Sequence, residues 1–224
     1  MVGSARRQPL FGITAALVVA VPALAGLQGC KIVSIAEDQA MRERMAAGFD
    51  ATRYVDGVWT RQALPYWTEA RQPLPVIVGA ARADLDAAGA ANGRRAGDGS
   101  PWTFVVTGQG VVEGVEAGRR GRMTVRLPNG GETVVVQTGP VVSGSALRDS
   151  LPFVHFNDFS NQLVYADVAQ AFTGKGMAQV RPAAEGLKAG DAVAFEGVLV
   201  VAEASVPLLV TPYRLTRVQA GATS

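Results

Sequence analysis

The sequence has little of the chemistry used by metal centres and disulfide frameworks, because it contains one cysteine, Cys30, and one histidine, His155. One cysteine excludes an internal disulfide, and one histidine excludes a histidine-rich zinc site, so we expect no metal and no other cofactor. Charge is also balanced after the first 29 residues: these contain Arg6 and Arg7 and no acidic residue, and removing the two arginines from the 21 basic residues leaves 19, against 19 acidic residues. This balance gives no reason to expect nucleic acid as a partner.

The 224 residues contain no repeat and no low-complexity tract. A hydrophobic content of 48% with 18% charged residues is typical of a folded protein rather than a disordered chain. The length allows one or two domains, and 26 glycines with 12 prolines indicate many turns.

The first 30 residues have the form of a bacterial lipoprotein signal. Arg6 and Arg7 precede an apolar run over residues 10–27, which is short for a membrane span, and Gly29 stands directly before Cys30. The pattern resembles the lipobox, whose cysteine is acylated; the alternative is an ordinary signal peptide followed by an incidental cysteine. We predict a signal peptide over residues 1–29, lipidation at Cys30, and the lipid bilayer as the partner of the acylated cysteine.

Residues 30–48 would then form the lipidated N-terminus and a charged stalk. The folded body would lie at the periplasmic face of the cell envelope. Lys31 stands where an aspartate would resemble an inner-membrane retention signal, so we expect the outer membrane.

Residues 49–95 carry helical patterns. Asp50 is a typical helix start, and the apolar stripe that follows predicts a short helix ending before Pro65. A second helix is expected to begin near Pro73 or Pro75 and to end at Gly93. The aromatic residues of this region either pack the two helices together or line a sugar platform; they are Tyr54, Trp59, Tyr66 and Trp67.

Residues 101–218 alternate with the period of strands, apart from one apolar helix predicted over residues 158–172, with Asp158 as its cap and Gly174 as its end. The predicted strands cover residues 102–115, 122–127, 132–138, 192–201 and 208–218. Three strands, a helix and two strands is the order of the OB-fold, with a β-sandwich as the alternative. We therefore predict an α+β fold: a small N-terminal helical region, then an OB-fold-like five-stranded antiparallel β-barrel with a helix between strands 3 and 4.

Residues 139–172 gather most of the unusual polar side chains of the chain among aromatic and aliphatic neighbours. We expect them to converge near the N-terminus of the predicted helix, where free backbone N–H groups favour acceptors. They form either a binding site for a hydroxyl-rich or carboxylate ligand, or for a partner, or a brace between strands and helix. The candidate residues are Arg148, Asp149, Asn157, Asp158 and Asn161.

Several short motifs of the chain resemble one family. They include Cys30-Lys31-Ile32-Val33, Phe49-Asp50-Ala51, Gly139-Pro140-Val141-Val142 and Phe156-Asn157-Asp158-Phe159. Together they resemble the predicted periplasmic lipoproteins called domain of unknown function 2291. The resemblance implies a role near solute uptake, because members are often encoded beside sugar-type ABC transporters, and it implies ABC transporter components or a sugar-type solute as partners.

Catalytic patterns are weak. Residues 139–145 have the glycine spacing of a phosphate loop, but Ser145 stands where lysine is required. A Ser-His-Asp set from Ser143 or Ser145 with His155 and Asp149 is possible by composition, although no nucleophile elbow accompanies it.

Asp149 and Asp158 could act as an acid and base pair, but an ion pair of Asp149 with Arg148 and a helix cap at Asp158 account for them better. The basic stretch 118–122 is interpreted as a solvated turn, or else as a contact with a membrane surface or an acidic protein. We therefore expect a non-enzymatic accessory or binding lipoprotein associated with sugar-type ABC transport. The alternative is a periplasmic hydrolase that uses acidic residues of segment 145–161.

Overall fold

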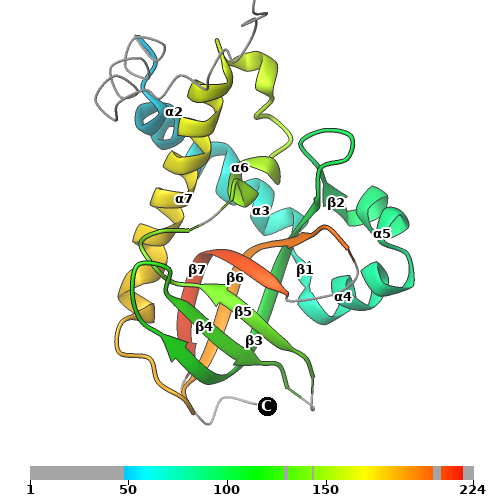
Figure 1. The fold of residues 1–224 in the computed structure, drawn as a ribbon, viewed down its shortest axis with the longest axis vertical. Helices are drawn as coiled ribbons and strands as arrows, with labels where there is room; N and C mark the ends of the chain where they lie inside the picture. Colours follow the sequence, from blue (N-terminus) through cyan, green and yellow to red (C-terminus); the bar gives the residue numbers. More distant parts are fainter. Residues whose placement is uncertain (1–47, 129–130, 143, 204–207, 219–224) are drawn as a thin grey trace, which may run out of the picture.

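The computed structural model describes residues 48–128, 131–142, 144–203 and 208–218 (Figure 1). The predicted signal peptide, Cys30 and nearly all of the predicted stalk lie outside the described residues. In the view of Figure 1, the sheet occupies the lower part of the molecule, and the long helix α7 (Gln162–Ala184) runs from the top down along one side of the sheet.

The first part of the described chain is helical. Its elements are α2 (Ala51–Val58), the π-helical turn η1 (Trp59–Ala63), α3 (Leu64–Ala70), α4 (Leu74–Ala83) and α5 (Leu85–Asn92). Asp50 caps α2 as predicted, because its carboxylate accepts the backbone N–H of Arg53 at 2.9 Å.

The prediction that the first helix ends before Pro65 is wrong. The chain continues through η1, where the N–H of Leu64 donates to the carbonyl of Trp59 five residues back, and α3 follows directly. Pro65 falls in the first turn of α3, directly after the π-helical turn.

The second predicted helix is divided in two at Asp84. This residue has an extended backbone, and its carboxylate accepts the N–H of Ala87 at 2.9 Å, which starts α5 as a separate helix. Pro75 lies in the first turn of α4, and Gly93 ends α5, as predicted.

The described residues form one sheet of seven strands. The strands are β1 (Gln72–Pro73), β2 (Gly93–Arg94), β3 (Trp102–Glu116), β4 (Arg122–Arg126), β5 (Thr133–Gln137), β6 (Ala192–Val201) and β7 (Leu209–Val218). The pairing order is β1-β3-β4-β5-β7-β6, and β3 also pairs with β2 and with β6.

The predicted five-stranded antiparallel barrel needs correction. Two short strands, β1 and β2, join the sheet from the helical region, and the β1–β3 and β5–β7 pairs are parallel. The sheet is not a closed barrel, because β5 and β7 are joined through only two residue pairs. The α+β class stands, and along the chain α7 lies between β5 and β6.

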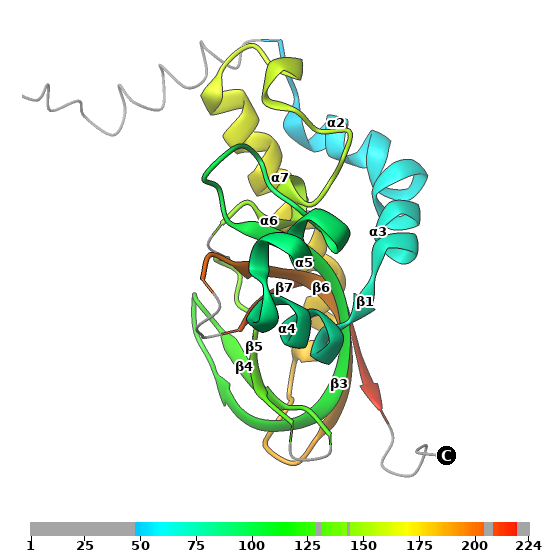
Figure 2. The same ribbon diagram turned by 90° about the vertical axis from the view of Figure 1, so that its right-hand side faces the viewer.

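The long strand β3 organises the sheet. Figure 2 shows it as one strongly curved strand whose first part pairs with β6 and whose last part pairs with β4. The register shifts between Val112 and Gly114, which lets the strand bend from one partner to the other. A second irregularity lies in β7, where Pro212 faces Gly197 beside a register shift, as predicted from the proline.

Three further helical segments follow β5. They are α6 (Ala146–Asp149), the 3₁₀ turn η2 (Phe156–Asp158) and α7 (Gln162–Ala184). The predicted helix 158–172 was placed too early and ended too soon: Asn161 is the cap, and α7 continues past Gly174. It continues because Met177 and Val180 in its last turns are buried against the sheet.

Two hydrophobic clusters hold the elements together. One packs α4, α5 and the end of α7 on the sheet, and the other packs α2 to α3 on α6, α7 and the strands β3, β6 and β7. In the second cluster Trp67 is fully buried, stacked on Tyr213 at 4.6 Å between ring centroids and edge-on to Trp59. The core interpretation of Trp59 and Trp67 is therefore confirmed, and α7 contributes residues to both clusters.

Candidate functional site

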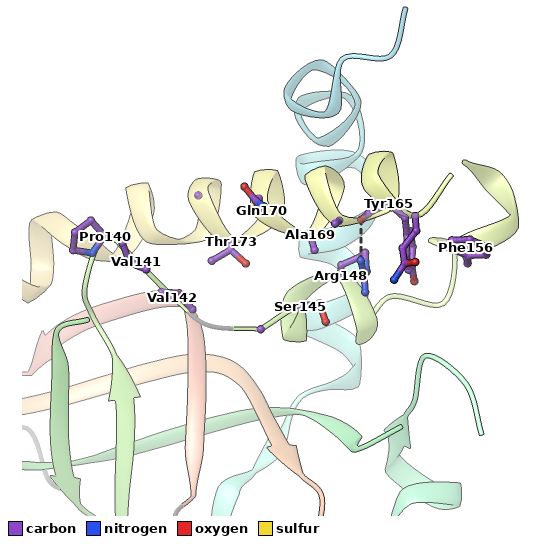
Figure 3. Close-up of a pocket in the computed structure, with 14 residues that line it drawn as sticks. Pro140, Val141, Val142, Ser145, Arg148, Phe156, Tyr165, Ala169, Gln170 and Thr173 are labelled. Atoms are coloured by element: carbon purple, nitrogen blue, oxygen red, sulfur yellow. Dashed lines mark hydrogen bonds between the residues drawn. The ribbon is translucent and has the colours of Figure 1, made fainter. Parts of the chain in front are cut away.

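A groove of about 1010 Å³ lies between α7 and the chain that approaches and forms α6 (Figure 3). One wall consists of residues 140–142, 144 and 145, and the floor is one face of α7. The lining residues are Pro140, Val141, Val142, Gly144, Ser145, Arg148, Phe156, Gln162, Tyr165, Ala166, Ala169, Gln170, Thr173 and Gly174.

The floor follows the helical repeat of α7. Ala166, Ala169 and Thr173 recur at spacings of three and four residues, so they share one face of the helix, and Gly174 follows Thr173 directly; all four are small. A side-chain carbon added at Gly174 would meet no atom within 4 Å. The small residues leave the space that forms the groove.

Arg148 ties α6 to α7 at one end of the groove. Its Nε donates to Asp149 Oδ1 at 2.7 Å, its Nη2 lies 2.6 Å from the same oxygen, and its Nη1 donates to the carbonyl of Tyr165 at 2.8 Å. The guanidinium also lies 3.5 Å from the centroid of the Tyr165 ring. Arg148 is only 7% exposed, so these contacts hold a buried charge in place while its edge faces the groove.

Asp149 is fully engaged beside it. One carboxylate oxygen receives Arg148 and the other accepts the hydroxyl of Ser145. Ser145 does not form the Ser-His-Asp set. Its hydroxyl donates to Asp149 directly, and His155 lines a different cavity. Ser143 lies outside the described residues.

The glycines of segment 139–145 allow a close backbone approach and a turn. A side-chain carbon on Gly139 would lie 2.1 Å from the backbone nitrogen of Gly121, and the Gly139 N–H donates to the Gly121 carbonyl at 2.9 Å. Gly144 has φ of +102°, which L side chains rarely adopt. The resemblance to a phosphate loop therefore reflects a close chain crossing and a turn.

The remaining candidate residues lie at the N-terminal end of α7 but do not all share one cavity. Asp158 Oδ2 accepts the backbone N–H of His155 at 2.9 Å and closes the turn η2. Asn161 Oδ1 accepts the N–H groups of Leu163 and Val164, at 2.9 and 3.0 Å, and so caps α7. Asn157 lies with Asp149 in a second cavity next to the groove.

The sequence reasoning missed Thr173. This residue is 8% exposed, and its hydroxyl oxygen is buried without a hydrogen-bond partner in the described part of the chain. Figure 3 shows it on the face of α7 that looks towards the wall of the groove. The prediction ended the helix at Gly174, which hid the repeat that places Thr173 one turn after Ala169.

Tyr165 separates the groove from the second cavity, because it lines both. Burial raises the pKa of its phenol, Arg148 lowers it, and Asp149 and Asp158 raise it again, so the pKa lies above its ordinary value. The phenol is therefore neutral at physiological pH. The ring packs against Phe156 at 5.5 Å in an edge-to-face arrangement.

Across the described ranges, no group of three or more histidine, cysteine or acidic side chains is placed to hold a metal ion. The same part of the chain contains no helix with the length and hydropathy needed to cross a membrane.

One solved crystal structure has a fold similar to that of this chain. An OB-fold protein from Thermotoga maritima superposes with a TM-score of 0.63 at 14% sequence identity, covering 76% of this chain and 99% of the other. At this identity the likeness shows the fold alone. It supports the prediction of an OB-like fold.

Comparison with curated proteins finds no match for the sequence. A family model described as "Predicted periplasmic lipoprotein (DUF2291)" matches residues 20–216. This match covers most of the chain, and it indicates a periplasmic, lipid-anchored protein without pointing to an enzymatic family. The chain therefore belongs to the DUF2291 family of predicted periplasmic lipoproteins.

Proposed function

We propose that this lipoprotein is a non-enzymatic binding protein whose groove along α7 holds a hydroxyl-rich solute of the sugar type. The observation that carries the proposal is the buried, unpartnered hydroxyl of Thr173 in the floor of that groove. A buried hydroxyl without a hydrogen bond costs on the order of 1–3 kcal/mol, and a ligand hydroxyl in the groove would remove this cost.

The rest of the lining suits the same class of ligand. Phe156 is 49% exposed and Val141 is 40% exposed, so both offer apolar surface for the C–H face of a sugar ring. Gln162 and Gln170 are exposed at the rim and supply amide donors and acceptors. A mostly apolar groove with a few polar groups is typical of small-molecule sites.

The chemistry of the lining favours binding over hydrolysis. None of its described residues is an aspartate or a glutamate. Asp149, the nearest candidate acid, already accepts bonds from Arg148 and Ser145. Asp158 holds the turn η2 instead. A hydrolase that uses acidic residues needs a free carboxylate within reach of its substrate, so this lining favours binding over that alternative.

The test uses Thr173→Val, which keeps the shape of the side chain and removes its hydroxyl. Calorimetric titration of the full chain in detergent with a panel of neutral monosaccharides should identify at least one that binds. We expect the variant to bind this sugar about tenfold more weakly, because the ligand loses a buried hydrogen bond. The variant should unfold at an equal or higher temperature, because an unpartnered buried hydroxyl is replaced by a methyl group.

The control is Thr211→Val. Thr211 is also buried, but its hydroxyl accepts a bond from the Gln137 amide at 2.8 Å, so this variant should lose stability and keep the wild-type affinity. A Thr173→Val protein that binds the sugar as tightly as the wild type would refute the role of the groove. Failure of every neutral sugar to bind would refute the ligand class.

We also propose that the protein acts beside a sugar-type ABC transporter, which the family resemblance supports. We propose further that it is anchored in the outer membrane, which Lys31 supports. Affinity purification of the acylated protein from membranes should bring down transporter components or their solute-binding protein. Recovery of the protein alone, or with inner-membrane fractions on a density gradient, would count against these two assignments.

The anchor is tested separately. Mass spectrometry should find an N-terminal acylated Cys30, and Cys30→Ser should move the protein from the membrane to the soluble fraction. An uncleaved leader or an unmodified cysteine would contradict this prediction.

A further inference from the structure

A second cavity of about 230 Å³ lies on the other side of Tyr165 from the groove. It is smaller and more polar, and two consecutive arginines form one of its walls. Its lining residues are Arg94, Arg95, Ala96, Asp149, Leu151, Val154, His155, Phe156, Asn157 and Tyr165.

Arg94 is held at this wall by the sheet. It belongs to β2, it pairs with Thr103 of β3, and its carbonyl accepts the Thr103 hydroxyl at 2.8 Å. Its side-chain Nε is buried and has no hydrogen-bond partner, and no carboxylate of the described residues forms an ion pair with it. A guanidinium fixed in this way presents an uncompensated positive charge.

The other charges around the cavity are already balanced. Arg95 pairs with Asp98 at 3.1 Å and lies 4.7 Å from the centroid of the Trp102 ring. Asp149, the carboxylate of the lining, is neutralised by Arg148. The cavity therefore carries the net positive charge of Arg94.

The facing wall offers polar groups rather than acids. His155 and Asn157 come from the segment that forms η2, and both are exposed. Asp158, which follows them, turns its carboxylate to the backbone N–H of His155. An imidazole and an amide opposite an arginine are suited to the oxygen atoms of an anion.

We propose that this cavity binds the anionic group of a small solute, a carboxylate or a phosphate monoester, with Arg94 as its main contact and Asn157 and His155 on the facing side. The volume suits such a group and is smaller than that of a site for a whole drug-sized molecule. The site goes beyond the sugar-type groove, since the groove proposal does not involve Arg94.

The experiment observes the arginine side chains of the full chain in detergent by ¹⁵N-edited NMR during separate titrations with inorganic phosphate and with acetate. The Nε–Hε resonance of Arg94, assigned by its loss in Arg94→Gln, should move and saturate with at least one anion. Arg94→Gln should weaken the affinity for that anion about tenfold, because it removes a charged donor. Phosphate alone, acetate alone or both would identify the anion accepted.

The control is Arg53→Gln, which removes the same charge from an exposed arginine on α2 outside the cavity and should leave the affinity unchanged. Asn157→Ala changes an exposed side chain and tests the opposite wall if Arg94→Gln fails to fold; it should also weaken binding. An Arg94 resonance that ignores both anions, or a titration that Arg53→Gln weakens as much as Arg94→Gln, would overturn the proposal. Neutral-sugar binding should be the same in wild type and Arg94→Gln, so this result is separate from the test of the groove.

Discussion

Replacing Arg148 should destabilise the fold, because this arginine braces α6 against α7. Its guanidinium contacts Asp149, the carbonyl of Tyr165 and the Tyr165 ring, and the side chain is 9% exposed. Arg148→Met keeps most of the buried side-chain length but removes all three interactions. It also leaves Asp149, whose side chain is 15% exposed, with a hydroxyl as its remaining partner.

The size of the effect follows from these losses. Removing one partner of a buried ion pair costs about 3–5 kcal/mol, and the partial exposure of Asp149 places the expected loss near the lower end, about 3 kcal/mol. For a domain of this length that corresponds to a melting temperature lower by about 6–12 °C. Arg148→Lys keeps the charge but loses the planar fork, so it should cost about 1 kcal/mol.

The assay is thermal and urea unfolding of the full chain, with Arg53→Met as the matched control because Arg53 is exposed. A double-mutant cycle with Asp149→Asn should give a coupling free energy of about 1–3 kcal/mol for the pair. If Arg148→Met melts within about 2 °C of Arg53→Met, the brace does not carry this stability. If it instead weakens only sugar binding, Arg148 is a ligand contact.

Two further predictions concern the scaffold around the groove. Gly174→Ala should raise the stability by about 0.5–1 kcal/mol, because Gly174 lies in a helix interior and the added carbon meets no atom within 4 Å. Gly139→Ala should lower the stability, because the added carbon would lie 2.1 Å from the backbone nitrogen of Gly121. Urea unfolding measures both changes, and equal effects of the two substitutions would contradict this packing. Burial is the main cause that raises the pKa of Tyr213 above its ordinary value, and the nearby Glu196 raises it further. As the pH rises above about 10, the phenol therefore ionises in the unfolded state before it ionises in the folded state, and the folded protein loses stability. The free energy of unfolding, measured across alkaline pH, should therefore decline less steeply with pH for Tyr213→Phe than for the wild type. An unchanged slope would show that the Tyr213 phenol does not cause the decline.

The local structure of much of the chain followed from residue patterns. Period-two alternation placed β6 at residues 192–201, and Pro212 marked the irregularity in β7, because a residue without an N–H interrupts a strand ladder wherever it occurs. Asp50 indicated the start of α2 for a similarly local reason: a short carboxylate side chain caps the N–H three residues on.

Patterns failed where two local signals competed. Asp158 and Asn161 are both good helix caps, and the sequence could not decide between them; the structure uses Asp158 for η2 and Asn161 for α7. Gly174 indicated a helix end, but burial of Met177 and Val180 against the sheet outweighs the cost of a glycine in the interior of the helix.

The sequence by itself determined the family and the OB-like order of strands and helix, and it predicts the lipoprotein signal, because each depends on residues close together in the chain or on their order. Only the tertiary structure decided which side chains share a cavity. Thr173 of α7 lines the same groove as Val142, and Arg94 of β2 lines the same cavity as Asn157, although no sequence spacing relates them. Burial without a partner is a property of the packed surroundings of an atom, and it was therefore visible for the Thr173 hydroxyl and the Arg94 Nε only after the chain had folded.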